Sequence, residues 1–411
     1  MIETLFTRIA GRPELDHEAG NGMRHVAALS MTKLADGLID PKLVLAWLLN
    51  ALGVPAPFVS ALVPIREAGA LLPQVFLAGW LGRMRQRRWM WVAGALVQGL
   101  AAGLIAVAAI TLTGAEAGWA FVVALGGLAV ARAASSVSYK DILGKTVGKS
   151  RRGAVTGFSG SVASAGVVVF ALLLVSGALQ DAIALAGAVA LAAFLFLAAA
   201  LIFAGLREAP SAVAQQAGGI ELFRYFREDP NFTRFVVARG FLTATALSPP
   251  YIVLLSGEAG GALGQLGALV IASAAAAFLS SWAWGRFSDR SSRKVLVAAG
   301  GLGAGAMLFA VGLHGLGLGA TYWALPLALF GLMIAHHGVR TGRSTYLVDI
   351  APEHARAGYA AASNTAIGVL LLVAGLVGGG LSVIGPVASL LGFAALALVG
   401  AGIALGLREA E

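Results

Sequence analysis

Apolar stretches of about 20 residues alternate with short polar segments along almost the whole chain. A helix of about 20 apolar residues, at a rise of about 1.5 Å per residue, crosses the hydrocarbon core of a bilayer. The expected spans are approximately residues 25–50, 57–80, 89–112, 118–139, 153–176, 182–205, 233–255, 262–284, 294–314, 320–345, 357–380 and 386–407. The pattern predicts an all-α membrane protein with twelve transmembrane helices.

The short polar segments between the spans differ in their basic residues. Segments 83–88, 140–152 and 286–294 hold four, five and four Lys or Arg, whereas the six segments on the opposite side hold none. Basic loops stay on the cytoplasmic side of a membrane. We therefore expect both termini to be cytoplasmic, in a plasma membrane or in the inner membrane of a bacterium. The polar N-terminus lacks the apolar core of a cleavable signal.

A repeat divides the chain into halves. Arg132 and Asp141 recur as Arg340 and Asp349, each at an offset of 208 residues. Repeats of this length in an apolar chain indicate two copies of one helix bundle, as in many transporters. We expect two pseudo-symmetric bundles of six helices. The expected organisation is a cytoplasmic segment at 1–24, bundles at 25–206 and 233–407, a cytoplasmic linker with an amphipathic helix at 207–232, and a tail at 408–411.

Composition agrees with a membrane protein and excludes other classes. Hydrophobic residues make up 58% of the chain, charged residues 12%, and the mean hydropathy is +0.84, whereas a soluble domain carries about 25% charged residues. The net charge of +9 comes from basic clusters between apolar stretches, so we expect no nucleic-acid partner. With no cysteine, the chain has no disulfide and no thiolate metal site. The expected partners are the lipid bilayer and a small molecule, and we expect a monomer.

Two motifs that could carry chemistry fail on their spacing. Residues 144–150 contain two Gly-Lys pairs but lack the glycine five residues earlier that a phosphate-binding loop requires. His336 and His337 have no carboxylate at metal-ligand spacing, so we expect no zinc site. No nucleophile and base are arranged for catalysis in the expected spans. We therefore expect no enzyme activity, no metal and no cofactor. If the chain is a transporter, we expect a proton to be the coupling ion.

The segment between spans 8 and 9 carries a motif, Gly285-x3-Asp289-Arg290-x2-Arg293-Lys294. It resembles the loop signature of the major facilitator superfamily, which has the form G-x3-D-R/K-x-G-R/K-R/K and lies between helices 2 and 3 and again between helices 8 and 9. The resemblance covers nearly the whole chain through the expected spans. It does not identify a subfamily, and span 5 lacks the Gly-Pro of the family's antiporter motif.

Further residues extend the resemblance. The first copy of the motif keeps Gly79, Arg87 and Arg88 but has Arg83 in place of the aspartate. Arg132 stands where family members often carry an arginine in helix 4. The segment from residue 349 to residue 358 is similar to the family's loop between helices 10 and 11. Asp141, Asp349 and Arg356 complete the expected gating-loop set.

Charged and imidazole side chains inside the expected spans are the candidate site residues. A charge at mid-bilayer costs about 2.5–3.5 kcal/mol on insertion scales, so each needs a partner or a hydrated cavity. The resemblance implies a central cavity lined by helices 1, 4, 7 and 10, with 2, 5, 8 and 11 beside it. The candidates are Lys33, Asp36, Asp40, Arg66, Glu67, Arg132, Arg239, His336, His337 and Arg340. Asp40 and Arg66 lie at matching depth, so we expect them to form an ion pair, and we expect a second pair between Lys33 and Asp36. The alternative to a role in transport is that these pairs only hold helices together.

The resemblance implies a secondary active transporter that works by alternating access. The charges of spans 1 and 2 cancel, so Arg132, Arg239, Arg340 and Arg343 leave the cavity about four positive charges, which favours a small anionic or amphiphilic organic solute. For proton coupling the first candidates are the carboxyl groups of Asp36, Asp40 and Glu67, with Asp40 preferred, because burial and a nearby arginine shift a carboxyl pKa in opposite directions. The two histidines are the second choice.

Other functions remain open from the sequence. A transporter-like scaffold could bind a pigment, a lipid or a protein without moving it. Within transport, a drug or metabolite efflux antiporter is an alternative to import. A membrane enzyme is the least supported class.

Overall fold

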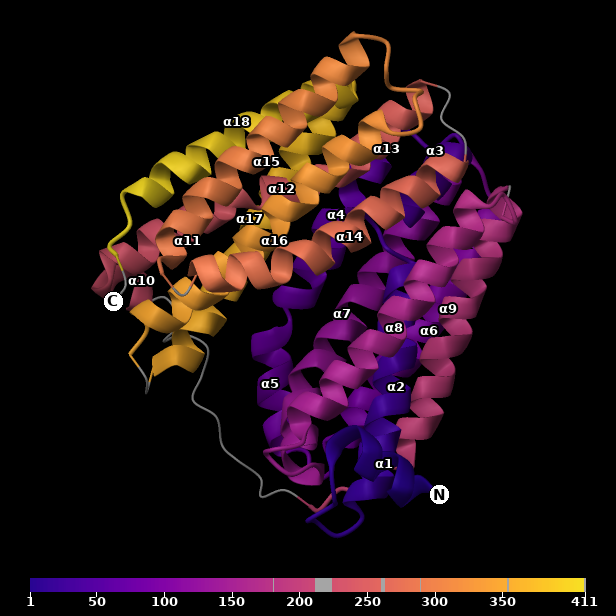
Figure 1. Ribbon diagram of the computed structural model, residues 1–411, viewed down its shortest axis with the longest axis vertical. Coiled ribbons are helices and arrows are strands. Elements are labelled where there is room, and N and C mark those ends of the chain that lie inside the picture. The colour runs from indigo at the N-terminus through magenta and orange to yellow at the C-terminus, as the bar shows by residue number, and fades with distance from the viewer. Residues whose placement is uncertain (180, 211–223, 260–262, 289, 353–354, 410–411) are drawn as a thin grey trace.

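The computed structural model describes residues 1–179, 181–210, 224–259, 263–288, 290–352 and 355–409, and all regular elements there are helices (Figure 1). Asp289 of the expected gating loop and residues 211–223 of the expected linker lie outside them. The first half holds α1 (Ile2–Ala10), α2 (Glu18–Leu38), α3 (Val44–Ala51), α4 (Ala56–Leu71), α5 (Gln74–Arg83), α6 (Arg88–Thr111), α7 (Gly114–Thr146), α8 (Arg152–Val175) and α9 (Ala182–Ala204). The second half holds α10 (Arg224–Glu228), α11 (Pro230–Leu242), α12 (Ala244–Leu247), α13 (Pro249–Glu258), α14 (Leu263–Ser288), α15 (Ser292–Gly315), α16 (Ala324–Ile350), α17 (Arg356–Ser382) and α18 (Pro386–Leu405).

Within the described residues, eight helical runs are each long and apolar enough to cross a membrane, and the bent pair α4 and α5 would make a ninth. The three other expected spans fall on α2 with α3, on α14 and on α16. α2 and α16 carry several of the charged and histidine candidates, which lower their hydropathy. A multi-pass helical membrane protein is therefore supported, and the number of twelve spans stays a prediction.

The first expected span is broken in the middle. Pro41, which has no N–H, lies between α2 and α3. Asp40 Oδ1 accepts the backbone N–H groups of Lys42 at 2.8 Å and Leu43 at 3.0 Å. These bonds satisfy N–H groups of the turn between α2 and α3, which matters most where water is scarce. Pro249, which follows Pro41 at the repeat offset of 208, similarly begins α13.

The chain is also helical before its first apolar window. α1 packs on α2 by placing the fully buried Phe6 against Gly22. Glu18, the first residue of α2, accepts the N–H of Gly148 at 2.8 Å and Nε–H of Arg151 at 3.1 Å. α2 begins seven residues earlier than expected, because a hydropathy window cannot detect a helix start that depends on such tertiary contacts.

The two halves pack against each other through α4 with α17 and α8 with α14. A β-carbon on Gly375 of α17 would overlap Pro64 of α4, and one on Gly267 of α14 would lie 2.7 Å from Cγ2 of Val175. The halves meet near α3 and α13 and diverge toward α1 and α10 (Figure 1). The glycines therefore allow a close contact at the end that the sequence predicts to face outside.

Candidate substrate and coupling site

Asp36 of α2 is the centre of an ion-pair cluster in the first half. Arg66 of α4 donates from Nη2 to Asp36 Oδ1 at 2.6 Å, and Arg132 of α7 forms an ion pair with Oδ2. The side chain of Arg66 is 9% exposed and that of Arg132 is 41% exposed. One carboxylate thus ties three helices together and leaves the cluster with one excess positive charge.

The ion pairs that we predicted for the first span are wrong. Arg66 binds Asp36 rather than Asp40, whose Oδ1 accepts two backbone N–H groups of the turn before α3. Lys33 donates instead to the carbonyl oxygen of Thr156 in α8, at 3.2 Å. Equal depth in a membrane does not specify which face of a helix meets the partner. The break after α2 directs Asp40 to the backbone, so the acid one turn earlier meets α4 and α7.

Glu67 of α4 is half-buried and has neither a hydrogen bond nor an ion pair within 4.0 Å in the described part of the chain. Four cations are close enough to act on its carboxylate: Lys42, Arg66 and Arg132 from the same half, and Arg343 from α16 of the other half. Glu67 is therefore an acid without a fixed partner that both halves influence.

Lys42 connects the two halves. Its Nζ lies 3.2 Å from Nε2 of His336 in α16, and because an ammonium can only donate, the histidine accepts there. Nδ1 of His336 and Nε2 of the adjacent His337 are buried and have no hydrogen-bond partner among the described residues. Both imidazoles thus retain a free polar atom at the boundary between the halves, which is a costly arrangement unless something binds there.

Arg239 of α11 is 5% exposed and has no acidic partner within the described chain. Nη1 donates to Ser363 Oγ at 2.6 Å and Nη2 to Asn364 Oδ1 at 3.1 Å, both on α17, while its buried Nε has no bond there. The charged group that acts on it is another cation, Arg343. Two neutral acceptors solvate the guanidinium but leave its charge uncompensated.

The repeat makes this imbalance visible. Arg340 is the counterpart of Arg132 at the offset of 208, whereas the counterpart of Asp36 is Ala244. Arg340 is exposed and has no ion pair in the described part of the structure. The acid that pairs with the arginine in the first half is thus missing from the second.

Solved structures of membrane transporters share this arrangement of helices. A crystal structure of a mutant of the nucleoside transporter NupG matches with a TM-score of 0.73 at 12% identity, over 94% of this chain and 99% of that one. The POT family transporter PepTSo matches with a TM-score of 0.69 at 10% identity, over 96% of this chain and 98% of that one. The chain has the fold of the major facilitator superfamily. No family sequence model and no curated protein sequence matches the chain, and at these identities the likeness describes the fold rather than a substrate.

In this fold, the loop between α5 and α6 holds the first copy of the loop motif. Arg87 forms an ion pair of 2.5 Å with Asp141 of α7, and Lys145 binds the same carboxylate. Arg88 donates to Oε1 of Gln86 at 3.1 Å. Arg87 of this copy is thus joined to the end of α7.

Glu208, which follows α9, anchors the same loop and was not among the predicted site residues. Its side chain is fully buried. Its carboxylate accepts the backbone N–H groups of Arg87 at 3.2 Å and Arg88 at 2.8 Å, and lies 3.4 Å from Nζ of Lys145. A negative charge at the start of α6 is favourable because the N–H groups of a first helical turn point toward it.

The second copy uses a comparable carboxylate after α18. Glu409 pairs with Arg293 and accepts the hydroxyl of Ser291, and that hydrogen bond lowers the pKa of Glu409 below its ordinary value. Asp349, the counterpart of Asp141, accepts instead from Ser292 Oγ at 3.2 Å. The residues of the repeat therefore occupy equivalent positions in the two halves, but they do not form the same ion pairs.

The other motif residues have fewer contacts. Arg290 and Arg356 are exposed, and Lys294 donates its backbone N–H to a serine hydroxyl at 3.2 Å. A β-carbon on Gly79 or Gly285 would meet nothing within 4 Å. The motif glycines thus lie in open positions at the end where the halves diverge.

A short repeat in the sequence could have identified the two glutamates. Gly-Leu-Arg-Glu-Ala follows the last helix of each half. Asn21 exchanges two hydrogen bonds of 2.9 Å with the backbone of Arg207, and Asn231 accepts the N–H of Arg408 at 3.0 Å. In each half, an asparagine of the second helix (α2 or α11) thus holds the segment that carries the glutamate. The partners of Arg239, Ser363 and Asn364, are uncharged, and no pattern in the sequence could have identified them.

Proposed function

We propose that the chain is a secondary active transporter that moves a small organic anion by alternating access, with a proton as the coupling ion. The observation that carries the proposal is the set of cations in the second half, where Arg239 and Arg340 have no acidic partner in the described residues. A carboxylate or phosphate would relieve the cost of these charges. The proposal includes a plasma membrane or bacterial inner membrane location with cytoplasmic termini.

In this proposal the anion binds between α11, α16 and α17. Nε of Arg239 would supply a donor that is buried and unused, and the free ring nitrogens of His336 and His337 lie on α16 at the boundary between the halves. Charge-assisted hydrogen bonds are about twice as strong as neutral ones, so Arg239 is the residue on which affinity should depend most.

Glu67 is the proposed carrier of the coupling proton. Asp36 is held by two arginines and Asp40 by two backbone N–H groups, so both carboxylates already have fixed partners. Glu67 lacks such partners, and Arg343 of the opposite half acts on it. When the halves move relative to each other, the distance to this cation changes, and proton affinity changes with it.

The anion specificity can be tested by thermal denaturation with matched pairs of solutes: benzoate and benzamide, succinate and succinamide, ribose 5-phosphate and ribose. A solute at 100 times its Kd stabilises by about 2.7 kcal/mol. We expect stabilisation by acids only, and its loss in Arg239→Gln. Arg234→Gln, on an exposed residue of the same helix, is the control. Equal stabilisation by the neutral analogues would reject an anionic substrate.

Coupling is tested in liposomes with an imposed pH gradient, using the acid that stabilises most. Glu67→Gln should exchange the solute across the membrane but no longer accumulate it, whereas Asp40→Asn should still accumulate it. Full accumulation by Glu67→Gln would remove this residue from the coupling role. No exchange by the unaltered protein for any stabilising acid would favour a binding scaffold without transport.

Orientation is tested by adding single cysteines, since the chain has none of its own. Cysteines at Ala115 and Gly317 should react with an impermeant thiol reagent in intact cells. Those at Gly148 and Ser292 should react only after permeabilisation. Reaction at Gly148 in intact cells would reverse the proposed topology.

A further inference from the structure

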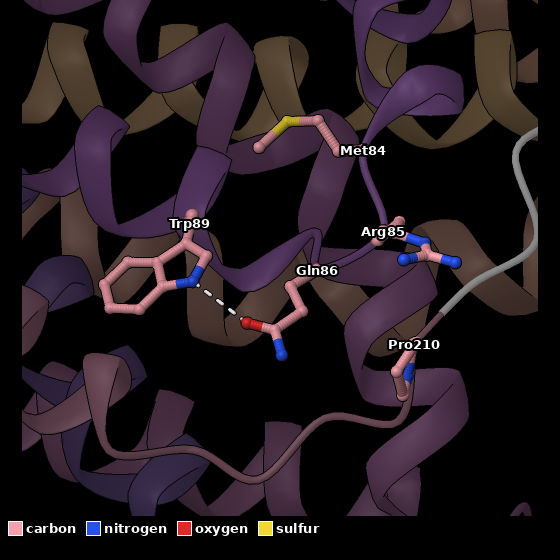
Figure 2. Close-up of a pocket in the computed structure, with 5 residues that line it drawn as sticks. All are labelled: Met84, Arg85, Gln86, Trp89 and Pro210. Carbon is pink, nitrogen blue, oxygen red and sulfur yellow. Dashed lines mark hydrogen bonds between the residues drawn. The ribbon is translucent and has the colours of Figure 1, made fainter.

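A pocket of about 540 Å³ lies where the chain enters α6, on the side of the first half that the sequence predicts to be cytoplasmic (Figure 2). It is lined by Met84, Arg85, Gln86, Trp89 and Pro210. An aromatic and a cationic side chain therefore line the same open pocket, which is separate from the ion-pair cluster around Asp36.

The ring of Trp89 is held in place within this pocket. Gln86 Oε1 accepts Nε1–H of Trp89 at 3.1 Å (Figure 2). The same oxygen also accepts Nη2–H of Arg88 at 3.1 Å. The guanidinium of Arg88 lies 5.1 Å from the centroid of the indole ring, within the range of a cation–π contact. Trp89 is nevertheless 46% exposed, so part of this aromatic side chain remains accessible.

The pocket also has excess positive charge. Of the four arginines in segment 83–88, Arg87 pairs with Asp141, and the guanidinium of Arg88 donates to the carbonyl oxygen of Leu206 and to Oε1 of Gln86. Arg85 is exposed and has no hydrogen bond or ion pair in the described part of the chain, and the same is true of Arg83. Arg85 can therefore bind an anion without giving up another contact.

An apolar stripe leads from the pocket along α6. Trp89, Leu96, Leu100 and Leu104 are 46%, 39%, 62% and 63% exposed, and their spacing of seven, four and four residues keeps them on one helix face. The stripe begins at the pocket and continues along a helix that is apolar enough to span a membrane.

We propose that this pocket binds the headgroup of an anionic phospholipid, with its phosphate on Arg85 and an acyl chain along the α6 stripe. Basic pockets on the cytoplasmic side of membrane helices suit anionic headgroups, and tryptophan favours the interface between headgroups and hydrocarbon. The apolar stripe distinguishes a lipid from a free phosphate, which would make no use of it. The inference does not depend on the proposed substrate.

Binding is measured by native mass spectrometry of the full chain released from a nonionic detergent, with dioleoyl phosphatidylglycerol or dioleoyl phosphatidylcholine added. We expect stronger binding of phosphatidylglycerol. Arg85→Gln should weaken it about fivefold, equivalent to about 1 kcal/mol for one basic residue near the surface, while Arg85→Lys should retain most of it. Trp89→Leu should weaken both lipids. Glycerol 1-phosphate should not compete at equal concentration.

The matched control is Arg290→Gln, an exposed arginine in the equivalent loop of the second half. It should leave the binding of phosphatidylglycerol unchanged. Equal binding of the two lipids, an unchanged affinity in Arg85→Gln, or the same loss in Arg290→Gln would overturn the proposal. Competition by glycerol 1-phosphate at equal concentration would show a phosphate site rather than a lipid site. An unchanged melting temperature of each variant without lipid confirms that folding is not the cause.

Discussion

Replacing Asp36 by asparagine should be the most damaging single change in the charge cluster of the first half. The substitution removes the carboxylate that Arg66 and Arg132 share, at nearly constant volume. Arg66, with a side chain only 9% exposed, would then be a buried cation whose closest partner is an amide. Arg132, 41% exposed, would remain partly solvated.

The magnitude follows from these exposures. Removing one partner of a buried ion pair costs about 3–5 kcal/mol, while the pair with the more exposed Arg132 contributes about 0–1 kcal/mol. Because the asparagine oxygen can still accept from Arg66, we expect a loss of about 3 kcal/mol for Asp36→Asn. Arg66→Gln leaves Asp36 paired with Arg132 and should cost about 2 kcal/mol. The double variant should lose less than the sum, with a coupling energy of about 2 kcal/mol.

The assay is reversible unfolding in mixed micelles of sodium dodecyl sulfate and a nonionic detergent, followed by circular dichroism. Asp40→Asn is the control, because its amide oxygen can still accept from the N–H groups of Lys42 and Leu43. It should cost less than about 1 kcal/mol, well below the loss of a buried ion pair, and show no coupling with Arg66→Gln. Coupling of Arg66 to residue 40 and none to residue 36 would refute the reasoning.

Two further predictions concern the contact between the halves and the glutamates that follow α9 and α18. The side chain introduced by Gly375→Val should overlap Pro64 and separate α17 from α4, so that added cysteines at this end react faster with thiol reagents. Gly380→Val is the control and should have no effect, because no atom lies within 4 Å of its β-carbon. Equal effects of the two variants would contradict the role of the contact. Glu208→Gln should lower the unfolding free energy by about 1–3 kcal/mol, because a fully buried carboxylate loses its charge at two N–H donors. Glu409→Gln should cost less, since Glu409 is more exposed. The pKa of Glu409 is lowered in the folded state, so its contribution to the unfolding free energy is present above its pKa in the unfolded chain and is lost as pH falls through the folded-state pKa. If Glu409→Gln still lowered the unfolding free energy in acid, that result would argue against this ion pair.

The fold could be predicted from hydropathy and the loop motif, but its helix breaks could not. The major facilitator fold expected from the motif is confirmed by the matching structures. A window of about 20 residues averages over local backbone chemistry, so it treated α2 and α3 as one helix. Pro41 was visible in the sequence, but whether a proline kinks or ends a membrane helix depends on whether a group such as Asp40 satisfies the freed donors.

The residue types of the candidate site could be predicted, whereas their partners could not. The cost of a charge in a membrane singled out Asp36, Arg66 and Arg132 as candidate site residues, and the structure brings them together. Which acid meets Arg66 depends on helix rotation, which depth does not determine. Glu208 was missed because it lies in a polar segment, where a charge needs no explanation; only its burial shows that it matters.

Under the proposed function, the symmetry of the two halves separates residues that hold the scaffold together from residues that bind the solute. The glutamates after the last helix recur in both halves, whereas Asp36 has Ala244 as its counterpart. Ala244→Asp should therefore restore the missing acid near Arg340, since Arg132 meets its acid at the equivalent place. We expect the stabilisation by anions to fall by more than about 1.4 kcal/mol, a factor of ten in affinity. Ala244→Asn has the same volume without the charge, so an equal loss in both variants would mean that space at this buried position, rather than charge, determines anion binding.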